Sequence, residues 1–296
     1  MSTCANASRA AAEPLPGTAA TAGTWLLIEQ PGPWGARALT DSRLDPGVGR
    51  ALGAWDAAGV RAALIRRPGR DGAAEERRAG RVFLAHTAPG NAWIRALCPA
   101  DPRELLALDP ARLGAGHHDG VGEPYRGAPL VLVCTNGRRD RCCAVLGRPL
   151  AAEAAAAGGA SVWEVTHLGG HRFAPTLLVL PHGYAYGWMT AVAVKDVVSA
   201  VQDGRVVTER CRGRSAWDRA GQAAELAVRA LTGEDGADAL TVAGGPRPTV
   251  SHRDGRAWRV TVARTEPGPP VPASCGADPE PQTRFEVTAV EPLGPR

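Results

Sequence analysis

The sequence predicts an α/β protein made of two halves with the same order of elements, followed by a C-terminal α+β extension. Short apolar stretches alternate with Ala-rich or amphipathic stretches, which is typical of strands and helices that follow one another. The order found in residues 24–113 returns in residues 128–205, although no residue-level repeat accompanies it. Residues 206–296 continue with a longer helical pattern and then with hairpin signals.

The first half, residues 24–113, combines four apolar strands with two helices. Leu52, Trp55 and Ala58 recur at helical spacing and predict the first helix. The order of elements is compatible with a thioredoxin-like half, and the glycine-rich residues 114–127 are the predicted linker. The expected elements are a strand at 24–29, a helix at 50–58, a strand at 60–65, a surface loop at 68–80, strands at 81–86 and 92–98, and a helix at 101–108.

The second half, residues 128–205, repeats this order around a group of Cys and His residues, which predicts a second thioredoxin-like half. An apolar strand leads to Cys134, and the polar loop after it ends in the pair Cys142-Cys143. The next strand ends on His167. The expected elements are a strand at 130–133, an Ala-rich helix at 144–157, a strand at 161–166, two shorter strands, and a helix at 192–201.

The two ends of the chain carry weaker signals. Residues 1–23 are rich in small residues and proline, so we expect a disordered N-terminal tail. Residues 267–281 are rich in Pro and Gly and are expected to be mobile. The other elements expected in the extension are a helix at 215–231, a hairpin of strands at 249–250 and 258–262 around Asp254-Gly255, and a last strand at 285–290.

Composition narrows the functional classes. Hydrophobic residues make up 44% and charged residues 22% of the 296 residues, as in ordinary globular proteins. A net charge of +4, with nearly every cation an Arg, gives little reason to expect nucleic-acid binding. No apolar run reaches the roughly 18 residues that span a bilayer, and residues 1–23 lack the pattern of a secretory signal. We therefore expect a cytoplasmic protein, in which disulfides are rare.

Two thiols and two imidazoles are expected to form a metal site in the second half. Cys134 and Cys143 lie at the ends of neighbouring elements, and His167 and His171 flank a Leu-Gly-Gly segment. Two glycines disfavour a helix there by roughly 1 kcal/mol each relative to Ala, so a tight loop is expected to direct both imidazoles into one cavity. The other Cys and His residues are interpreted as buried thiols and as structural or exposed imidazoles: Cys4, Cys98, Cys211, Cys275, His86, His117, His118, His182 and His252.

Four segments resemble the sucrase/ferredoxin-like family. The two most specific are CTNGRRDRCCA at 134–144 and HLGGHRFA at 167–174, and WLLIEQPGPWG at 25–35 and RGRSAW at 212–217 add to them. The family pattern is a Cys, then a loop that ends in Arg-Asp-x-x-Cys, then His-x-Gly-Gly-His. The cluster domain of the family is a thioredoxin-like ferredoxin, in which two Cys and two His hold a [2Fe-2S] cluster.

The resemblance implies an electron-transfer protein whose [2Fe-2S] cluster is held by Cys134, Cys143, His167 and His171. Asn136 departs from the family pattern, because many relatives have His there, and Cys142 offers an alternative thiolate beside Cys143. An electron carrier is expected more than a catalyst, and no carboxylate pair stands out as a glycosidase site. The expected partner is a redox protein, with no nucleic acid and no membrane.

The charge of such a cluster has consequences for its reduction potential. His ligation leaves the reduced cluster less negative than four thiolates would, which raises the potential. The loop residues Arg138, Arg139 and Arg141 either favour the reduced state further or are only solvated. A ligating imidazole can also hold a proton, so we expect proton-coupled reduction, with a potential that falls by up to roughly 59 mV per pH unit.

Three alternatives remain open. Structural zinc suits two Cys and two His, although Cys134 and Cys143 are farther apart than zinc-finger ligands usually are. A thiol-disulfide oxidoreductase suits thiols at a helix start, although no C-x-x-C motif is present. A binding or scaffold domain with buried histidines is the third. A last expectation, from similarity to thioredoxin folds, is a cis peptide bond at Ala174-Pro175, a form adopted by only about 5–6% of such bonds.

Overall fold

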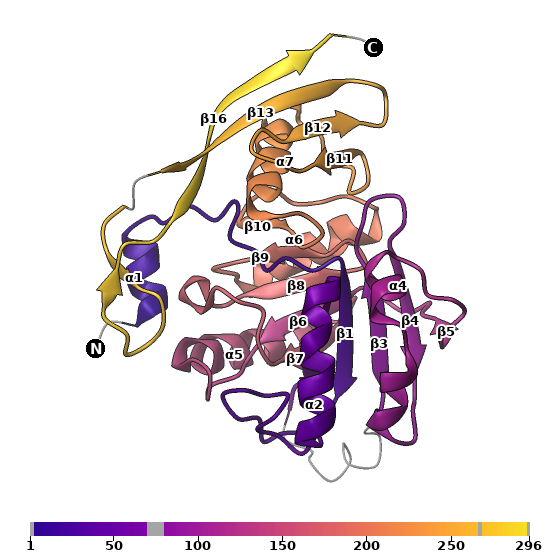
Figure 1. Cartoon of the computed structure of the whole chain (residues 1–296). Coiled ribbons are helices and arrows are strands. Elements are labelled where there is room, and N and C mark those ends of the chain that lie inside the picture. The colour runs from indigo at the N-terminus through magenta and orange to yellow at the C-terminus, as the bar shows by residue number, and fades with distance from the viewer. Residues whose placement is uncertain (1–2, 70–79, 266–267, 295–296) are drawn as a thin grey trace.

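The computed structural model describes residues 3–69, 80–265 and 268–294. These residues form a mixed α/β protein around a ten-stranded sheet (Figure 1). The strands of this sheet are β1 (Thr24–Glu29), β2 (Val60–Arg66), β3 (Val82–His86), β4 (Trp93–Leu97), β5 (Glu123–Pro124), β6 (Leu130–Cys134), β7 (Ser161–Val165), β8 (Leu177–Leu180), β9 (Tyr184–Tyr186) and β10 (Cys211–Arg214).

The strand order of the sheet is β10-β9-β8-β6-β7-β2-β1-β3-β4-β5. In each half the first two strands are parallel, β1 with β2 and β6 with β7, and the third strand pairs antiparallel with the first. The halves join where β2 pairs antiparallel with β7. One continuous sheet therefore contains the strand orders β2-β1-β3-β4 and β7-β6-β8-β9 on the two sides of this pairing.

Helices of the first half cover one face of strands β1 to β3. Leu26, Leu64 and Leu84 of the sheet pack there against Leu52 and Trp55. The helix expected at 50–58 is a helix that tightens to a 3₁₀ turn, and the one at 101–108 is 3₁₀ throughout. The covering elements are α2 (Pro46–Gly53), η1 (Ala54–Ala58), η2 (Pro102–Ala107) and α4 (Pro110–Gly114).

In the second half, α5 (Arg141–Ala157) and α6 (Ala191–Gln202) pack on β6, β7 and β8. The core between them is aliphatic, with Val131 and Val133 of β6 against Leu150 of α5 and Val197 of α6. Helix α5 begins three residues before the predicted start. Its N-cap is Asp140, whose carboxylate accepts the amide hydrogen of Cys142 at 2.8 Å. The vicinal thiols therefore lie in the first turn of the helix.

The C-terminal extension contains helix α7 (Arg219–Thr232) and a four-stranded antiparallel sheet. Figure 1 shows α7 beside this sheet. Ala224 and Val228 of the helix pack on Leu240, Val250 and Trp258 of the sheet. The predicted hairpin is present, with Asp254-Gly255 in its turn. The strands are β11 (Leu240–Ala243), β12 (Thr249–His252), β13 (Ala257–Thr265) and β16 (Arg284–Leu293).

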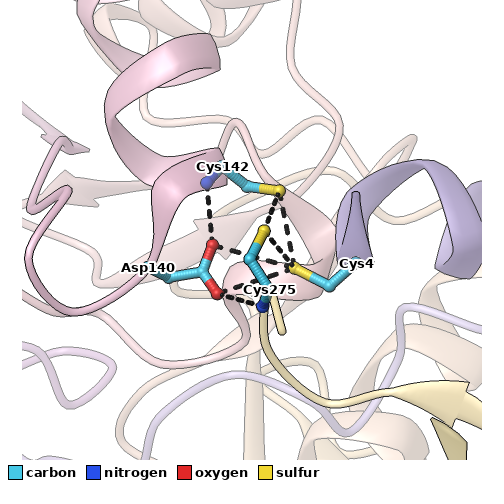
Figure 2. Close-up of side chains that lie close together, drawn as sticks. All are labelled: Cys4, Asp140, Cys142 and Cys275. Atoms are coloured by element: carbon cyan, nitrogen blue, oxygen red, sulfur yellow. Dashed lines mark hydrogen bonds between the residues drawn. The ribbon is translucent and has the colours of Figure 1, made fainter. Parts of the chain in front are cut away.

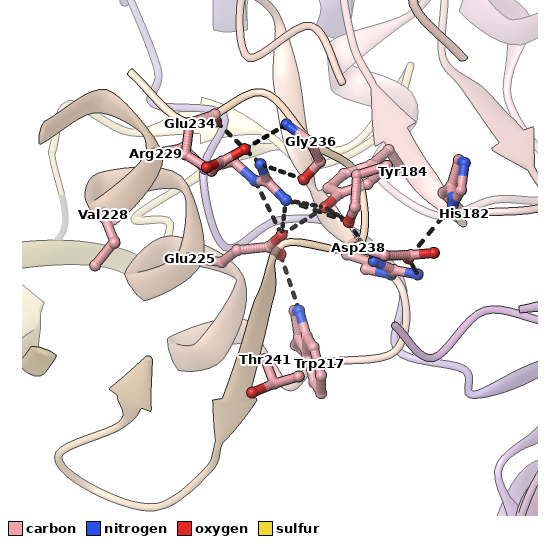
Figure 3. A network of polar contacts seen from close by, with 12 residues as sticks. His182, Tyr184, Trp217, Glu225, Val228, Arg229, Glu234, Gly236, Asp238 and Thr241 are labelled. Carbon is pink, nitrogen blue, oxygen red and sulfur yellow. Dashed lines mark hydrogen bonds and ion pairs between the residues drawn. The ribbon is translucent and has the colours of Figure 1, made fainter. Parts of the chain in front are cut away.

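A buried polar network fixes α7 to strand β9 (Figure 3). Glu225 and Arg229 form an ion pair of 3.0 Å, and neither side chain has exposed surface. The Tyr184 hydroxyl donates to the Glu225 carboxylate, and Arg229 donates to the Gly236 carbonyl at 3.1 Å. Trp217 donates to the second carboxylate oxygen of Glu225 at 2.8 Å. Each buried charge is thus paired and hydrogen-bonded, as a buried ion pair requires.

The N-terminal segment expected to be disordered, residues 1–23, is ordered in its described part, residues 3–23. Helix α1 (Cys4–Ala10) forms there, and Cys4, Ala5 and Ser8 are buried. Glu13 accepts a hydrogen bond from Ser8 at 2.7 Å and pairs with Arg172 at 2.8 Å. Long-range contacts order this segment, and local composition does not report such contacts.

Residues 268–281, which were expected to be mobile, contain a short hairpin of β14 (Val271–Pro272) and β15 (Pro279–Glu280). Val271 is buried, and the hairpin lies beside α1 (Figure 1). The predicted linker contributes edge strand β5, and most of the surface loop expected at 68–80 falls outside the described residues. Within the described ranges, no helix is both long and apolar enough to cross a membrane.

Candidate functional site

The four predicted ligands gather at one end of the second half. Cys134 is the last residue of β6, and Cys143 lies in the first turn of α5. His167 follows the end of β7, and His171 opens the short helix η3 (His171–Phe173). Because β6 and β7 are parallel, their carboxyl ends meet at the edge of the sheet from which α5 starts. The thiols are buried, with exposed fractions of 2% and 1%, whereas both imidazoles are partly exposed.

The two thiols influence each other's proton affinity. The Cys143 thiol lowers the pKa of Cys134, burial opposes this effect, and His167 lowers the pKa further. The pKa of Cys143 is raised by Cys134 and by burial. The Cys134 thiol also lies 3.3 Å from the Thr166 carbonyl oxygen. Cys134 is therefore the member of the pair that loses its proton first, and a thiolate is the form that binds metal.

The two imidazoles lie side by side, with ring centroids 5.5 Å apart. Both Nδ1 atoms are buried and have no hydrogen-bond partner among the residues that the structure describes. The Nε2 atom of His171 lies 3.9 Å from the Asp140 carboxylate. Burial lowers the pKa of His171, and Asp140 partly opposes this effect. Buried polar atoms are normally paired, so these two nitrogens, which lie beside two thiols, are donor atoms that a bound group could use.

The loop between the imidazoles has the sharp turn expected from its glycines. Gly169 and Gly170 have φ values of +75° and +67°, which glycine adopts more readily than other residues. A Cβ at Gly170 would collide with the guanidinium of Arg212. Arg212 is fully buried, which lowers its pKa to about 9, and it donates to the Gly169 carbonyl at 3.0 Å. Next to this loop, the predicted cis bond at Ala174-Pro175 is confirmed.

Close contact between α5 and β6 brings Cys143 to Cys134. Gly147 faces the Cys134 carbonyl oxygen, and a Cβ at this glycine would collide with it. We expect Gly147→Ala to lower the free energy of unfolding by about 1–3 kcal/mol, because the added methyl forces backbone apart. Thermal or urea unfolding measures this change. The control is Gly53→Ala, in a helical position where the new Cβ meets a Leu39 side chain at 3.6 Å, and it should be neutral or stabilising.

A second group of side chains lies beside the predicted ligands (Figure 2). It comprises Cys4, Asp140, Cys142 and Cys275, and one donor atom of each lies within 4.8 Å of the others. Over the described ranges, no other set of three or more Cys, His or acidic residues has its donor atoms this close together. The four predicted ligands lie farther apart than this. The side chain of Cys142 therefore faces away from the Cys134–Cys143 pair, toward Cys4 and Cys275.

Sequence reasoning missed this second group. Cys4 and Cys275 were interpreted as isolated buried thiols, and Cys142 only as a substitute for Cys143. The three cysteines are separated by 138 and 133 positions, so no local spacing connects them. The one signal available was Asp140, a good N-cap residue directly before a helix that carries two thiols.

The structure also places the loop arginines, Asn136 and His252. Arg138, Arg139 and Arg141 are exposed around the site. Asn136, at the position that departs from the family pattern, is buried and donates to the Gly35 carbonyl at 3.0 Å. His252 makes short contacts with Glu234 and Asp254, at 2.8 and 2.7 Å, in agreement with a structural role.

Comparison with known proteins gives one match. The sequence model of the sucrase/ferredoxin-like family matches residues 15–213, which is more than half of the chain. The matched region includes β1 to β9, the four predicted ligands and most of β10, and it ends before α7. No curated protein and no solved structure matched the chain.

Proposed function

Because the chain belongs to the sucrase/ferredoxin-like family, we propose that it is an electron-transfer protein that holds a [2Fe-2S] cluster. Its ligands would be Cys134, Cys143, His167 and His171. The observation that carries the proposal is the pair of buried, unpartnered Nδ1 atoms beside two buried thiols. The order β7-β6-β8-β9, with α5 after β6 and α6 after β9, supports a thioredoxin-like ferredoxin domain.

The donor set fits this cluster in kind and in arrangement. Thiolates and imidazole nitrogens are established ligands of [2Fe-2S] centres. The Nδ1 atoms of both imidazoles are buried without a hydrogen-bond partner among the described residues, and the Nε2 atom of His171 lies 3.9 Å from the Asp140 carboxylate, so Nδ1 is the available donor of that ring. A single zinc ion needs all four donors around one centre, whereas two irons share the donors between them. Among the described residues, the donor atoms of these four do not all lie within 4.8 Å of one another. This separation favours a two-iron cluster over a single zinc ion.

When bound, a [2Fe-2S] cluster accepts and releases one electron. The protein's own part is to exclude water on the thiol side and to leave the imidazole side accessible. The thiols are buried, whereas the His171 side chain is 14% exposed. The path from the cluster to a redox partner protein would therefore be shorter on the imidazole side than on the thiol side. The exposed Arg138, Arg139 and Arg141 around this face would attract an acidic partner surface and steer its approach.

The test is metal analysis of protein purified without oxygen. We expect about two irons and two sulfides per chain, and visible absorption that bleaches when dithionite is added. Protein that contains neither iron nor sulfide, and whose zinc is lost on changing Cys134 or Cys143 to Ser, would instead support the zinc alternative. The reduction potential measured at different pH values would test the predicted proton coupling.

A further inference from the structure

We propose that Cys4, Asp140, Cys142 and Cys275 form a separate Zn²⁺ site that fastens helix α1 and the turn between β14 and β15 to helix α5 (Figure 2). None of these residues belongs to the proposed cluster ligands, so the site goes beyond the proposed function. Cys4 comes from α1, Asp140 and Cys142 from the start of α5, and Cys275 from the turn between β14 and β15.

The donor atoms have nearly the spacing of a tetrahedral site. The Sγ–Sγ distances are 3.5 Å for Cys4–Cys142, 3.6 Å for Cys4–Cys275 and 3.1 Å for Cys142–Cys275. Each Asp140 oxygen lies 3.7 Å from the Cys4 sulfur. Zinc–sulfur bonds of about 2.3 Å at tetrahedral angles place sulfurs about 3.8 Å apart. A small outward shift of Cys142 and Cys275 would complete this geometry.

The chemistry of the donors also favours zinc. Three thiolates and one carboxylate carry the same total charge as the four thiolates of a common structural zinc site. Cys4, Cys142 and Asp140 have exposed fractions of only 1%, 1% and 4%. A divalent cation would offset the cost of gathering these groups away from water.

Two further features are typical of a metal site. The amides of Cys142 and Cys275 each donate to one Asp140 oxygen at 2.8 Å, which fixes the orientation of the carboxylate. A surface pocket lined by Thr3, Cys4, Arg141 and Cys275 opens beside the thiols and gives an ion a path of entry.

The proposed zinc site lies where α1, the β14–β15 hairpin and the start of α5 meet. Helix α1 contacts both η3, which begins at His171, and strand β14. Asp140 lies 3.9 Å from His171 and accepts the Cys275 amide hydrogen at 2.8 Å. Zinc would therefore hold α1 and the β14–β15 hairpin beside η3, next to the proposed cluster site.

The adjacent residues Cys142 and Cys143 give the sharpest test. The intact protein, purified with reductant, should contain about one zinc per chain. Cys142→Ser, Cys4→Ser and Cys275→Ser should each lose zinc and keep any iron, whereas Cys143→Ser should keep zinc. The exposed thiol of Cys98 provides the control, because Cys98→Ser should change neither metal. Co²⁺ in place of zinc should give thiolate-to-metal absorption that disappears in Cys4→Ser.

Three results would overturn the zinc site. One is zinc content that is unchanged in Cys4→Ser and Cys275→Ser. Another is a disulfide between Cys142 and Cys275 in protein purified without oxidant, shown by peptide mass. The third is hydrogen exchange over 4–10 and 271–280 that does not increase after zinc is removed with a chelator. Each result is independent of iron and sulfide content, so failure of this site is distinguishable from failure of the proposed cluster.

Discussion

Changing Cys134 or Cys143 to Ser should remove nearly all iron and sulfide from the purified protein. Each change deletes one thiol of a buried pair, and the neighbouring thiol of Cys142 lies against Cys4 and Cys275 instead. His167→Ala and His171→Ala should cause the same loss or a clear change in the visible spectrum. Iron, sulfide and absorption measured together on each variant test this expectation.

Cys142→Ser is the matched control, since it alters the neighbouring thiol of the same helical turn. The side chain of Cys142 faces Cys4 and Cys275, so the cluster should survive. If Cys142→Ser abolishes the cluster while Cys143→Ser spares it, the ligand assignment is wrong by one residue. Circular dichroism should show that all variants remain folded.

Glu225→Gln should lower the free energy of unfolding by about 3–5 kcal/mol, because it leaves the buried guanidinium of Arg229 without its counter-charge. Both side chains of this ion pair have no exposed surface. The lost charge also weakens the hydrogen bonds from Tyr184 and Trp217. Urea unfolding, followed by circular dichroism, measures the change.

The control for this prediction is the exposed pair Arg247–Glu291, whose side chains are 54% and 58% exposed. Glu291→Gln should cost at most about 1 kcal/mol, as is usual for surface ion pairs. The double variant Glu225→Gln with Arg229→Met should recover part of the stability, because it removes the unpaired charge. Equal small effects at both pairs would show that the buried network does not hold α7 in place.

Much of the fold could be predicted because its signals are local. The apolar run at 24–29 is strand β1, the run at 130–133 is most of β6, and the helical period at 192–201 is most of α6. Asp254-Gly255 marks its hairpin turn, and the two glycines after Leu168 mark the turn between the imidazoles. In each case a few neighbouring residues determine the backbone conformation.

Other features depend on contacts between distant residues. The small residues of α1 predict no order, yet Cys4 and Glu13 are buried against groups more than 130 positions away. The same holds for Cys275, whose partners become visible only when the β14–β15 turn packs against the start of α5. The burial of the Glu225–Arg229 pair could not be predicted either, because an i, i+4 ion pair is usually an exposed feature of a helix.

Pulsed EPR of the dithionite-reduced protein tests the central claim most directly, because it detects nitrogen nuclei bound to the paramagnetic cluster. The proposed ligands predict coupling to two imidazole nitrogens in the intact protein. Coupling to one of them should disappear in His171→Cys, provided that this variant retains a cluster. A reduced cluster without any coupled imidazole nitrogen would contradict ligation by His167 and His171, even if iron and sulfide were present in equal amounts.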